Sequence, residues 1–384
     1  MVEKQLGLNQ SVARKMNNNL AINEFRKNPI SGTELSEILH LSNATSSSII
    51  KSLLSKNIIR VDSSDSVSGV GRKRLKYTIN EKFGLILVIS LTSYRLHTVL
   101  ADINSNTLYE SESEISEYNF ATLKNAVDTT KDLLEKPQFN GMSLKCVIIS
   151  LPGLINKKTG ELQVGPQFSQ DLFSNKNQLI TYPQEVLGCP VYLENDSKLM
   201  MLAELSSGEF SKVESGMLAY IDYGVGGAFE FNNKIYFGSR GYSGEIGRLR
   251  VDFDDIHSHL DDVASIRVMK EEIAKVTGKI LKTAEIVELF KNGDELVKSL
   301  VLRSAKALGI VIKEVIRVFD IEQFTVSGRV SQFGDTYLNE VKRQIIKENP
   351  DAIVRYSKID SSAIIEGAKA MAANIVIQEA LENL

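Results

Sequence analysis

The stretch AYIDYGVGGAFEFNNKIYFGSRGYSGEIGRLR, residues 219–250, decides the fold. A buried strand over 218–222 runs into the loop Gly-Val-Gly-Gly at 224–227. Glycines there allow the backbone to turn sharply and to direct N–H groups at an anion or a polar ligand. A second strand returns through Asn232 and Asn233, a pair typical of a hairpin turn. The pattern predicts two paired strands with a ligand-facing loop between them.

A second glycine-rich loop follows this hairpin. Gly238, Gly241, Gly244 and Gly247 fall within ten residues and surround Glu245. Glycine serves many turns for purely conformational reasons, so neither loop alone identifies a site. The order strand, glycine loop, strand, glycine loop is much more specific than either loop.

On these residues the sequence resembles the ROK group of repressors and sugar kinases, which has the hexokinase/actin-like ATPase fold. The agreement with that group's signature lies at Gly224, Gly226, Ala228, Gly238, Gly244, Gly247 and the basic Arg248. Other segments resemble the family's Pro-Gly segment beside the sugar (150–155), its Asn-Asp sugar site (193–197) and its adenosine region (325–330). Gly367 and Ala368 fit its final helix, so the resemblance covers nearly the whole chain.

The resemblance implies an α/β fold, in which an N-terminal winged helix-turn-helix precedes a two-lobed actin/hexokinase-like (ribonuclease H-like) ATPase-fold domain. With 384 residues the chain is too long for one compact core. We expect a DNA-binding domain over 1–82, a first lobe over 83–198 and a second lobe over 199–384, whose C-terminal helix packs back on the first lobe. Helices expected over 299–318 and 362–381 are rich in apolar residues, which indicates burial in a lobe or at a subunit interface.

Three helix patterns occupy the first sixty residues. The first covers 11–27 and ends before Pro29. Its side chains expected in a core are Val12, Met16, Leu20, Ile22 and Phe25. Ser31 and Glu34 form a capping-box pattern for a short second helix. The apolar positions of that helix are Leu35, Ile38 and Leu41.

The third helix begins at Ser42 or Asn43. Its inward stripe consists of Ile49, Ile50, Leu53 and Leu54. Small hydroxyl and amide side chains near its start suit a helix that enters a major groove, because they bond to phosphates and base edges without steric cost. The candidate DNA-contacting residues are Asn43, Thr45, Ser46, Ser47, Ser48 and Lys51. The alternative is a solvated serine-rich helix start that merely caps itself.

Two short strands, 58–61 and 75–79, follow this helix and enclose a polar loop. The loop ends in three further candidate DNA-contacting residues, Arg72, Lys73 and Arg74. Three helices followed by a hairpin with a basic loop is the order of a winged helix-turn-helix, whose wing lies along the DNA backbone or reaches into the minor groove. A charge run by itself is usually a solvated loop, and here its position after three helices favours DNA contact.

Charge and composition indicate the partner and the compartment. Residues 1–80 carry twelve Lys or Arg against six Asp or Glu, a net +6, whereas the other 304 residues carry a net −9. A basic front on an acidic body favours a polyanion partner, which here is double-stranded DNA. No apolar run approaches the ~20 residues of a membrane helix, and the start MVEKQLGLNQ lacks the apolar core of a signal peptide. Cys146 and Cys189 lie in apolar stretches, as free buried thiols do, so we expect a cytoplasmic protein without a membrane partner.

The resemblance assigns roles to residues of the expected cleft. Asp196 matches the aspartate that, in family kinases, takes the proton from the attacking sugar hydroxyl. The ligand-binding positions it implies are Pro152, Gly153, Asn195, Asp196, Glu245, Arg248 and Asp261. Asn195 and Glu245 match residues that bond sugar hydroxyls, and Asp261 matches a sugar-binding glutamate. Alternatively, Asp196 caps the helix that begins near Ser197.

Two departures from the family separate this chain from its enzymes. Ser90 stands where the family's first phosphate loop begins with an aspartate, and no glycine follows, so we expect no ATP, no Mg²⁺ and no catalytic residue. The family's zinc site needs a histidine and three cysteines, but Arg248 replaces the histidine and 251–265 contains no cysteine. His257 and His259 lack thiolate partners, and a solvated acidic loop is the stronger interpretation, so we expect no metal.

These residues predict a repressor of carbohydrate-utilisation genes, controlled by a sugar or sugar-phosphate effector between the two lobes. Arg248 is a fixed cation and favours an anionic effector, a sugar phosphate or sugar acid, unless a nearby carboxylate pairs with it. Winged-helix repressors bind paired half-sites, so a homo-oligomer, either a dimer or a dimer of dimers, is expected. The alternatives are an active sugar kinase and a constitutive DNA-binding protein with a vestigial sensor.

Overall fold

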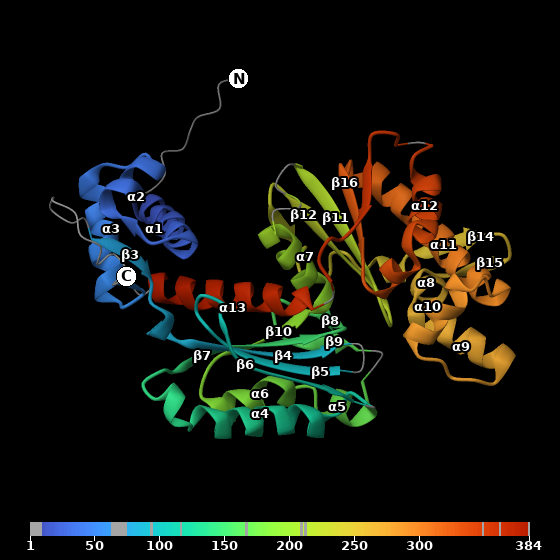
Figure 1. The fold of residues 1–384 in the computed structure, drawn as a ribbon, viewed down its shortest axis with the longest axis horizontal. Helices are drawn as coiled ribbons and strands as arrows, with labels where there is room; N and C mark the ends of the chain where they lie inside the picture. The colour runs from blue at the N-terminus through green and yellow to red at the C-terminus, as the bar shows by residue number, and fades with distance from the viewer. Residues whose placement is uncertain are drawn as a thin grey trace.

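Three parts make up the molecule: a helical N-terminal part and two five-stranded sheets, each with its own helices (Figure 1). The computed structural model describes residues 10–62, 75–92, 95–115, 117–165, 168–207, 210, 213–347, 349–360 and 362–382. Among these residues, no helix is both long and apolar enough to cross a bilayer.

The N-terminal part contains three helices and a small antiparallel sheet, in the order of a winged helix-turn-helix. The helices are α1 (Gln10–Lys27), α2 (Gly32–Ile38) and α3 (Asn43–Ser55). The strands are β1 (Ile30–Ser31), β2 (Ile59–Val61) and β3 (Lys76–Ile79), in the order β1-β3-β2. The expected basic residues Arg72, Lys73 and Arg74 lie outside the described residues.

Local hydrogen bonds fix the start of α2 and of α3. The Ser31 hydroxyl accepts from the Glu34 N–H at 3.3 Å, and the Glu34 carboxylate accepts from the Ser31 N–H at 2.6 Å, which confirms the capping box. Ser42 caps α3 by accepting from the Thr45 N–H at 3.1 Å. Because Ile30 and Ser31 also pair with β3, the same short segment ties α2 to the hairpin.

The buried face of α1 differs from the expected one. Ile22 and Phe25 are buried as predicted, but Met16 and Leu20 are exposed, and so is Ile38 on α2. The predicted core positions of Met16 and Leu20 are therefore wrong. The buried side chains of α1, Asn18, Ala21, Ile22 and Phe25, follow at helical spacing, which turns residues 16 and 20 to the other side of the helix.

The first five-stranded sheet has the strand order β10-β7-β4-β5-β6. Its strands are β4 (Leu85–Thr92), β5 (Arg95–Asp102), β6 (Thr107–Glu114), β7 (Leu144–Leu151) and β10 (Val191–Asn195). β4, β7 and β10 are parallel, β5 is antiparallel to β4, and β6 is antiparallel to β5. Helices α4 (Phe120–Leu134) and α6 (Gln178–Leu187), with the short α5 (Gln170–Ser174), cover one face of this sheet (Figure 1). A small hairpin of β8 (Leu154–Ile155) and β9 (Leu162–Val164) follows β7.

The second five-stranded sheet has the strand order β13-β12-β11-β16-β17. Its strands are β11 (Ser215–Ile221), β12 (Val225–Phe231), β13 (Lys234–Tyr236), β16 (Gln323–Ser327) and β17 (Ile353–Tyr356). The hairpin turn predicted at Asn232 and Asn233 is present, and both residues have a positive φ. Beyond the sheet lie a hairpin of β14 (Arg250–Phe253) and β15 (Ile256–His259) and five helices: α8 (Asp261–Ala264), α9 (Ile266–Thr277), α10 (Thr283–Lys291), α11 (Glu295–Phe319) and α12 (Gly334–Ile345).

Two helices, α7 (Asp196–Ser207) and α13 (Ala363–Glu382), lie between the two sheets and pack on each other (Figure 1). α13 also contacts β4 and β7, so the last helix of the chain covers the inner face of the first sheet. The lobe division placed after residue 198 would cut α7. The buried stripe of that helix, which includes Leu199 and Met201, continues in one apolar cluster with both sheets.

The crossing of α7 and α13 generates a stability prediction at Gly367. A Cβ built there would fall on the backbone carbonyl of Leu199, and backbone cannot move aside as a flexible side chain can. We expect Gly367→Ala to lower the free energy of unfolding by about 2 kcal/mol, in the range of overpacking costs. Denaturant unfolding measures this change. Helix propensity alone predicts the opposite, a gain of about 1 kcal/mol, and such a gain would contradict the tight crossing.

Candidate functional site

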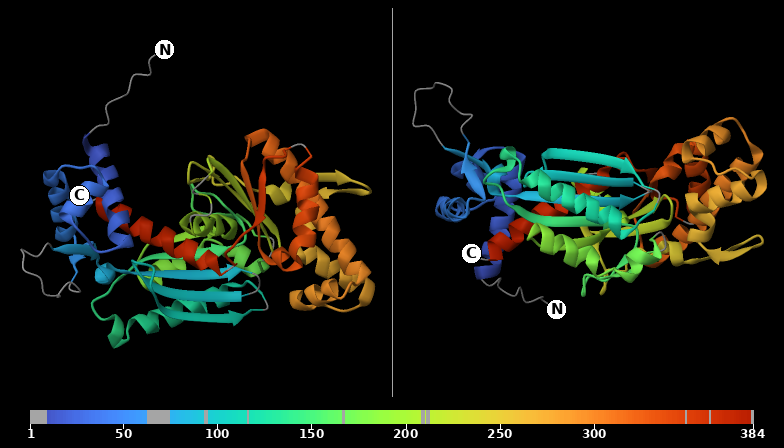
Figure 2. Two further views of the ribbon diagram at one scale, coloured as in Figure 1. Left: turned by 45° about the horizontal axis from the view of Figure 1, so that its top comes forward. Right: turned by 90° about the horizontal axis from the view of Figure 1, so that it is seen from below.

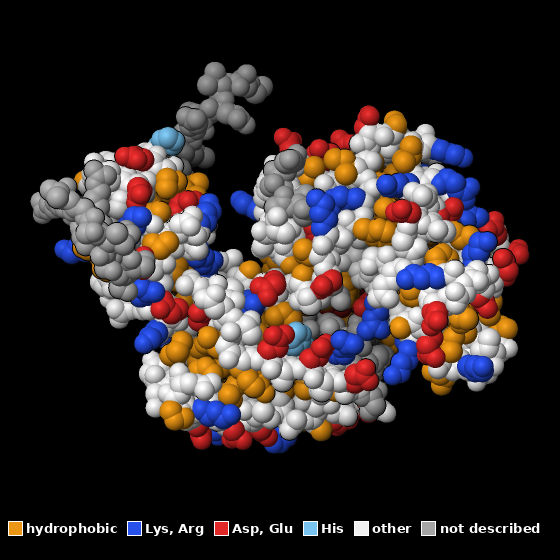
Figure 3. Space-filling view, viewed as in Figure 1, with side chains coloured by type: hydrophobic (Ala, Val, Ile, Leu, Met, Phe, Trp, Pro, Cys, Tyr) orange, Lys and Arg blue, Asp and Glu red, His pale blue; other side chains and the backbone are white. Residues whose placement is uncertain are grey.

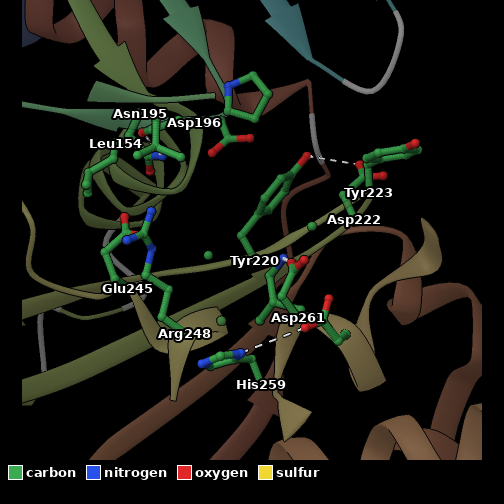
Figure 4. Close-up of a pocket in the computed structure, with 18 residues that line it drawn as sticks. Leu154, Asn195, Asp196, Tyr220, Asp222, Tyr223, Glu245, Arg248, His259 and Asp261 are labelled. Carbon is green, nitrogen blue, oxygen red and sulfur yellow. Dashed lines mark hydrogen bonds and ion pairs between the residues drawn. The ribbon is translucent and has the colours of Figure 1, made fainter. Parts of the chain in front are cut away.

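A cavity of about 430 Å³ lies between the two sheets, and all seven cleft residues singled out from the sequence line it (Figure 4). Those residues are Pro152, Gly153, Asn195, Asp196, Glu245, Arg248 and Asp261. They come from four different segments that are up to 109 positions apart in the chain, from position 152 to position 261. The structure therefore places the expected ligand-binding residues around one space.

Sheet topology brings the first four of these residues together. β7 and β10 are parallel neighbours, with Leu151 opposite Asn195, so the segments that follow them leave the sheet at the same edge. The Asn195 amide donates to the Gly153 carbonyl at 3.0 Å, which joins the two segments across the edge. A Cβ at Gly153 would lie 2.7 Å from the Val164 carbonyl, so only glycine allows this close approach.

Asp196 is the first residue of α7 and is almost completely buried. Its Oδ1 accepts from the Ser197 N–H at 2.8 Å, and the side-chain Oδ1 of Asn195 accepts from the same group at 3.0 Å. Both residues thus cap α7 while they line the cavity. Burial raises the pKa of Asp196 to about 7, and the negative charges of Asp222 and Glu245 add to the effect. The carboxyl is therefore divided between its neutral and charged forms near neutral pH.

Glu245 caps the short 3₁₀ turn Ile246–Arg248, and Arg248 is its last residue. The Arg248 Nε lies 3.4 Å from the Glu245 carboxylate, so the cation already has an anionic partner. Burial raises the pKa of Glu245, and the positive charges of Arg248 and Lys198 oppose that rise. The geometry favours the ion-pair alternative for Arg248 over a free cation that waits for an anionic ligand.

Asp261 shapes the cavity more than it extends into it. Its Oδ1 accepts from the Val225 N–H at 2.7 Å, and its Oδ2 lies 2.9 Å from the Arg267 guanidinium. The carboxylate thereby holds the glycine turn between β11 and β12 in place. Both oxygens are thus engaged within the protein. Asp261 therefore has fewer acceptor sites left for the direct sugar contact that the sequence predicts.

Sequence reasoning missed a polar cluster beside the glycine turn, formed by the buried Tyr220 and Asp222 and the partly buried Arg329. The Tyr220 hydroxyl, at the inner wall, donates to Asp222 at 3.3 Å, and the Arg329 Nε lies 3.2 Å from the same carboxylate (Figure 4). Asp222 lines both the cavity described above and a second one of about 530 Å³, so this group separates the two. A sequence signal for Asp222 exists, because a carboxylate lies directly before the first glycine-rich loop. No such signal exists for its partner Arg329, which is more than a hundred residues away in the chain.

The described residues offer no cluster of three His, Cys, Asp or Glu side chains that could hold a metal ion. His257 contacts Asp252 at 2.9 Å, and His259 lies 3.9 Å from Asp262. These separate pairs do not fit the family's zinc site. Nor does Ser90 supply the carboxylate that Mg²⁺ needs, because its side chain is a hydroxyl. That hydroxyl is buried and lies 3.3 Å from the Thr92 hydroxyl.

On α3, four of the six candidate DNA-contacting residues are exposed: Asn43, Ser47, Ser48 and Lys51. Thr45 is half-buried and bonds to Ser42. Ser46 is fully buried, and its hydroxyl donates to the Gly32 carbonyl at 2.7 Å. The assignment of Ser46 to the DNA surface is therefore wrong, because its hydroxyl holds α3 against the start of α2.

The sequence and the fold both match proteins of one family. The model of the ROK family matches residues 89–375. The chain is 23% identical to the xylose repressor of Caldicellulosiruptor bescii, over 94% of this chain and 96% of that one. The solved structure of a ROK family transcriptional regulator, a homologue of the Escherichia coli MLC protein, superimposes over 96% of this chain and 99% of its own, with a TM-score of 0.78 at 19% identity. A ROK hexokinase from Thermus thermophilus covers 76% of this chain and 99% of its own, with a TM-score of 0.60 at 19% identity.

The buried carboxyl of Asp196 generates a pH-dependent prediction. Its pKa is about 7 in the folded state and near 4 in an unfolded chain, so between these values only the folded state holds the proton. Stability from this group is then lost as pH rises from about 4 to about 7. Because Asn stays neutral, we expect Asp196→Asn to unfold with a free energy higher than wild type by on the order of 4 kcal/mol at pH 8, shrinking to less than half of that at pH 5.

Thermal and denaturant unfolding between pH 5 and pH 8 measure this difference. Asp255→Asn is the matched control, because Asp255 is exposed on the turn between β14 and β15. A difference between Asp196→Asn and wild type that does not change with pH would contradict the raised pKa.

Proposed function

This chain belongs to the ROK family, and we propose that it is a DNA-binding transcriptional repressor controlled by a sugar bound in the cleft cavity. The observation that carries the proposal is that one chain joins a winged-helix order of elements to a sugar-kinase-like pair of sheets. Relatives named xylose repressors match along almost the whole length of the chain, its N-terminal part included.

The cavity favours a neutral, hydroxyl-rich effector over an anionic one. Carboxylate and amide groups such as those of Asp196, Asn195 and Glu245 accept from or donate to neighbouring hydroxyls in pairs. Acidic residues at the cavity outnumber Arg248 and His259, its only basic residues among those described, and Arg248 is paired with Glu245. A phosphate would meet net negative charge there. We therefore propose a neutral sugar in place of the sugar phosphate expected from Arg248 alone.

Catalysis of phosphoryl transfer is the competing function, and Asp196 is the observation that favours it. A carboxyl with a pKa of about 7 suits a general base. A kinase also needs a metal-binding carboxylate and an open, electropositive path for the triphosphate. Ser90 lacks the first. The second cavity does carry cationic side chains, among them Lys270, Lys282 and Arg329, but the Asp222 carboxylate lies between it and the sugar cavity. We propose that the chain is not an enzyme, and an assay of ADP release over a sugar panel tests this.

The exposed start of α3 supplies the DNA contacts in this proposal. Asn43, Ser47 and Lys51 recur at every fourth position and therefore share one face of the helix. A groove between this face, the start of α2 and β3 includes all three residues. Winged helices read one half-site each, so we propose that a homodimer places two copies of α3 in successive major grooves.

Helix α13 provides the route from the cleft to the DNA-binding part. α7 starts at the cavity with Asp196 and packs on α13, whose other end lies beside α1 (Figures 1 and 2). There the Arg26 guanidinium donates to the side-chain Oδ1 of Asn374 at 2.8 Å, and the Gln378 side-chain amide donates to the Oδ1 of Asn19 at 2.7 Å. Open space separates the N-terminal part from the second sheet in Figure 3, so movement of the cleft must travel along α13 or the first sheet.

Some polar atoms at the contact between α1 and α13 have no hydrogen-bond partner, which suits a contact that can adopt two orientations. The Arg26 Nη2 and the side-chain Oδ1 of Asn18 are buried and find no hydrogen-bond partner among the described residues. An unsatisfied buried polar group costs about 1–3 kcal/mol, so an alternative orientation that satisfies it competes well. We propose that the sugar selects between two orientations and so resets the spacing of the two wings.

A gel shift on the chain's own upstream DNA tests the function most simply. The proposal expects binding that weakens steeply with salt and that changes when D-xylose, D-glucose or N-acetylglucosamine is added. A thermal shift with the same sugars separates a working sensor from a vestigial one, because a bound ligand raises the melting temperature. Failure to bind upstream DNA at low ionic strength would remove the proposal.

Two adjacent serines of α3 give a paired prediction. Ser47→Ala leaves stability within about 0.5 kcal/mol, since the side chain is exposed, and alters the preference among operator variants. Ser46→Ala lowers the free energy of unfolding by about 1 kcal/mol, because the Gly32 carbonyl loses its donor, and leaves sequence preference unchanged. Gel shifts on a set of operator variants and denaturant unfolding check both, and reversed phenotypes would contradict the described face of α3.

The joint between α1 and α13 gives a coupling prediction. Asn374→Ala removes the acceptor for Arg26, so the sugar's effect on DNA affinity should fall at least threefold while sugar affinity without DNA stays within twofold. Asn339→Ala, an exposed helical position on α12, is the matched control. An unchanged sugar effect in Asn374→Ala would show that the joint does not carry the signal.

A further inference from the structure

Lys198 is a lysine in the interior of the protein, two positions after Asp196 on α7. It is only 3% exposed, although lysine is almost never fully buried without partners. Desolvation lowers the pKa of its ammonium group to about 8. Taking a charge out of water is costly, so the groups around it must compensate.

The Lys198 ammonium donates hydrogen bonds to two backbone carbonyls, one in the second sheet and one in the loop that follows β13. It donates to the Gly227 carbonyl on β12 at 3.0 Å and to the Ser243 carbonyl in the loop 238–247. That loop carries Glu245. A Cβ at Gly244 would lie 2.9 Å from the Lys198 nitrogen, so the loop rests directly on the ammonium group.

Acidic and basic side chains alternate around Lys198. The buried Glu194 carboxylate pairs with the Lys157 ammonium, and the negative charges of Glu245 and Glu194 both favour the charged form of Lys198. Lys157 also reaches the second sheet's side, since its N–H donates to the Arg240 carbonyl at 2.9 Å and its ammonium lies 4.9 Å from the Phe237 ring centre. The four residues 157, 194, 198 and 245 thus link the segment after β7, the end of β10, α7 and the loop 238–247.

Lys198 does not line the cavity, whereas Glu245 does. Any effect of Lys198 on a ligand must therefore pass through the loop that it holds. A purely space-filling role would not need an ammonium group, because an apolar side chain of similar volume often replaces a buried charge without loss of stability. The Gly227 carbonyl also accepts from the Ser197 hydroxyl at 3.1 Å, so the bond to the Ser243 carbonyl is the one that ties the loop 238–247 to Lys198. Both carbonyls belong to the two glycine-rich segments that border the cavity.

We propose that Lys198 is a positioning residue for the effector pocket, and that from beneath the pocket it fixes the loop 238–247 and with it the carboxylate of Glu245. The inference rests on the proposed function, because it names a residue that sets the affinity of that pocket for its sugar. Lys157 and Glu194 extend the same support to the segment on the opposite side of the pocket.

A double-mutant cycle with Lys198→Met and Glu245→Gln tests this role. Calorimetry with D-xylose, D-glucose and N-acetylglucosamine measures affinity, and the sugar that binds wild type best is used throughout. Each single variant should lose at least tenfold in affinity, and the double variant should lose no more than Glu245→Gln alone. Lys158→Met, at an exposed neighbour of Lys157, should keep wild-type affinity. Losses that multiply, or an unchanged affinity in Lys198→Met, would overturn the proposal.

Hydrogen exchange of the ligand-free protein gives a second measurement that does not depend on the effector. Amides in 238–247 should exchange at least tenfold faster in Lys198→Met than in wild type or Lys158→Met, and unchanged exchange would also overturn the proposal. If no sugar binds wild type, the proposed function fails while this measurement still decides the role of Lys198. If Lys198→Met does not fold, Lys198→Gln takes its place in both experiments with the same outcomes, because it keeps a polar side chain but removes the charge and is too short to reach both carbonyls.

Discussion

The packing of α7 on α13 is the contact on which the rest of the molecule depends. Both helices lie between the two sheets, and their crossing is so close that only glycine fits at position 367. α7 begins at the cavity, and α13 ends against α1, so one rigid pair of helices connects the cleft with the N-terminal part. In a closely packed interior such a pair shifts as a unit, which is how a small change at a ligand becomes a change of orientation elsewhere.

The cavity itself is built from the ends of strands. Parallel β7 and β10 bring Gly153 and Asn195 to one edge, and the glycine turn after β11 and the loop around Glu245 close the opposite side. Its electrostatics are those of a pocket for hydroxyl groups: carboxyls whose pKa values are raised by burial, and one arginine already paired. The polar group around Asp222 lies where this pocket meets the neighbouring cavity.

Much of this arrangement could be predicted from the sequence, because local patterns carry it. The capping box at Ser31 and Glu34 and the turn at Asn232 and Asn233 depend on neighbouring residues, and the cleft motifs follow strands whose ends must meet. Ser46 is buried, although the sequence predicts it on the DNA surface, because small hydroxyl side chains are mostly exposed. Its helical spacing with Ile49, Ile50 and Leu53 is the pattern that places it on the inner face. Lys198 and Arg26 could not be predicted for another reason. Their partners, Ser243 and Asn374, are distant in the chain, and no local sequence pattern predicts a buried cation.

The most direct measurement of the central claim is the affinity for a sugar, determined by calorimetry with the free protein and again with the protein saturated by its upstream DNA duplex. Coupling between two sites is reciprocal, so the factor by which the sugar changes DNA affinity must equal the factor by which DNA changes sugar affinity. The account predicts a sugar affinity that differs at least fivefold between the two forms. Equal affinities in the presence and absence of DNA would contradict it, because the cleft and the N-terminal part would then act independently.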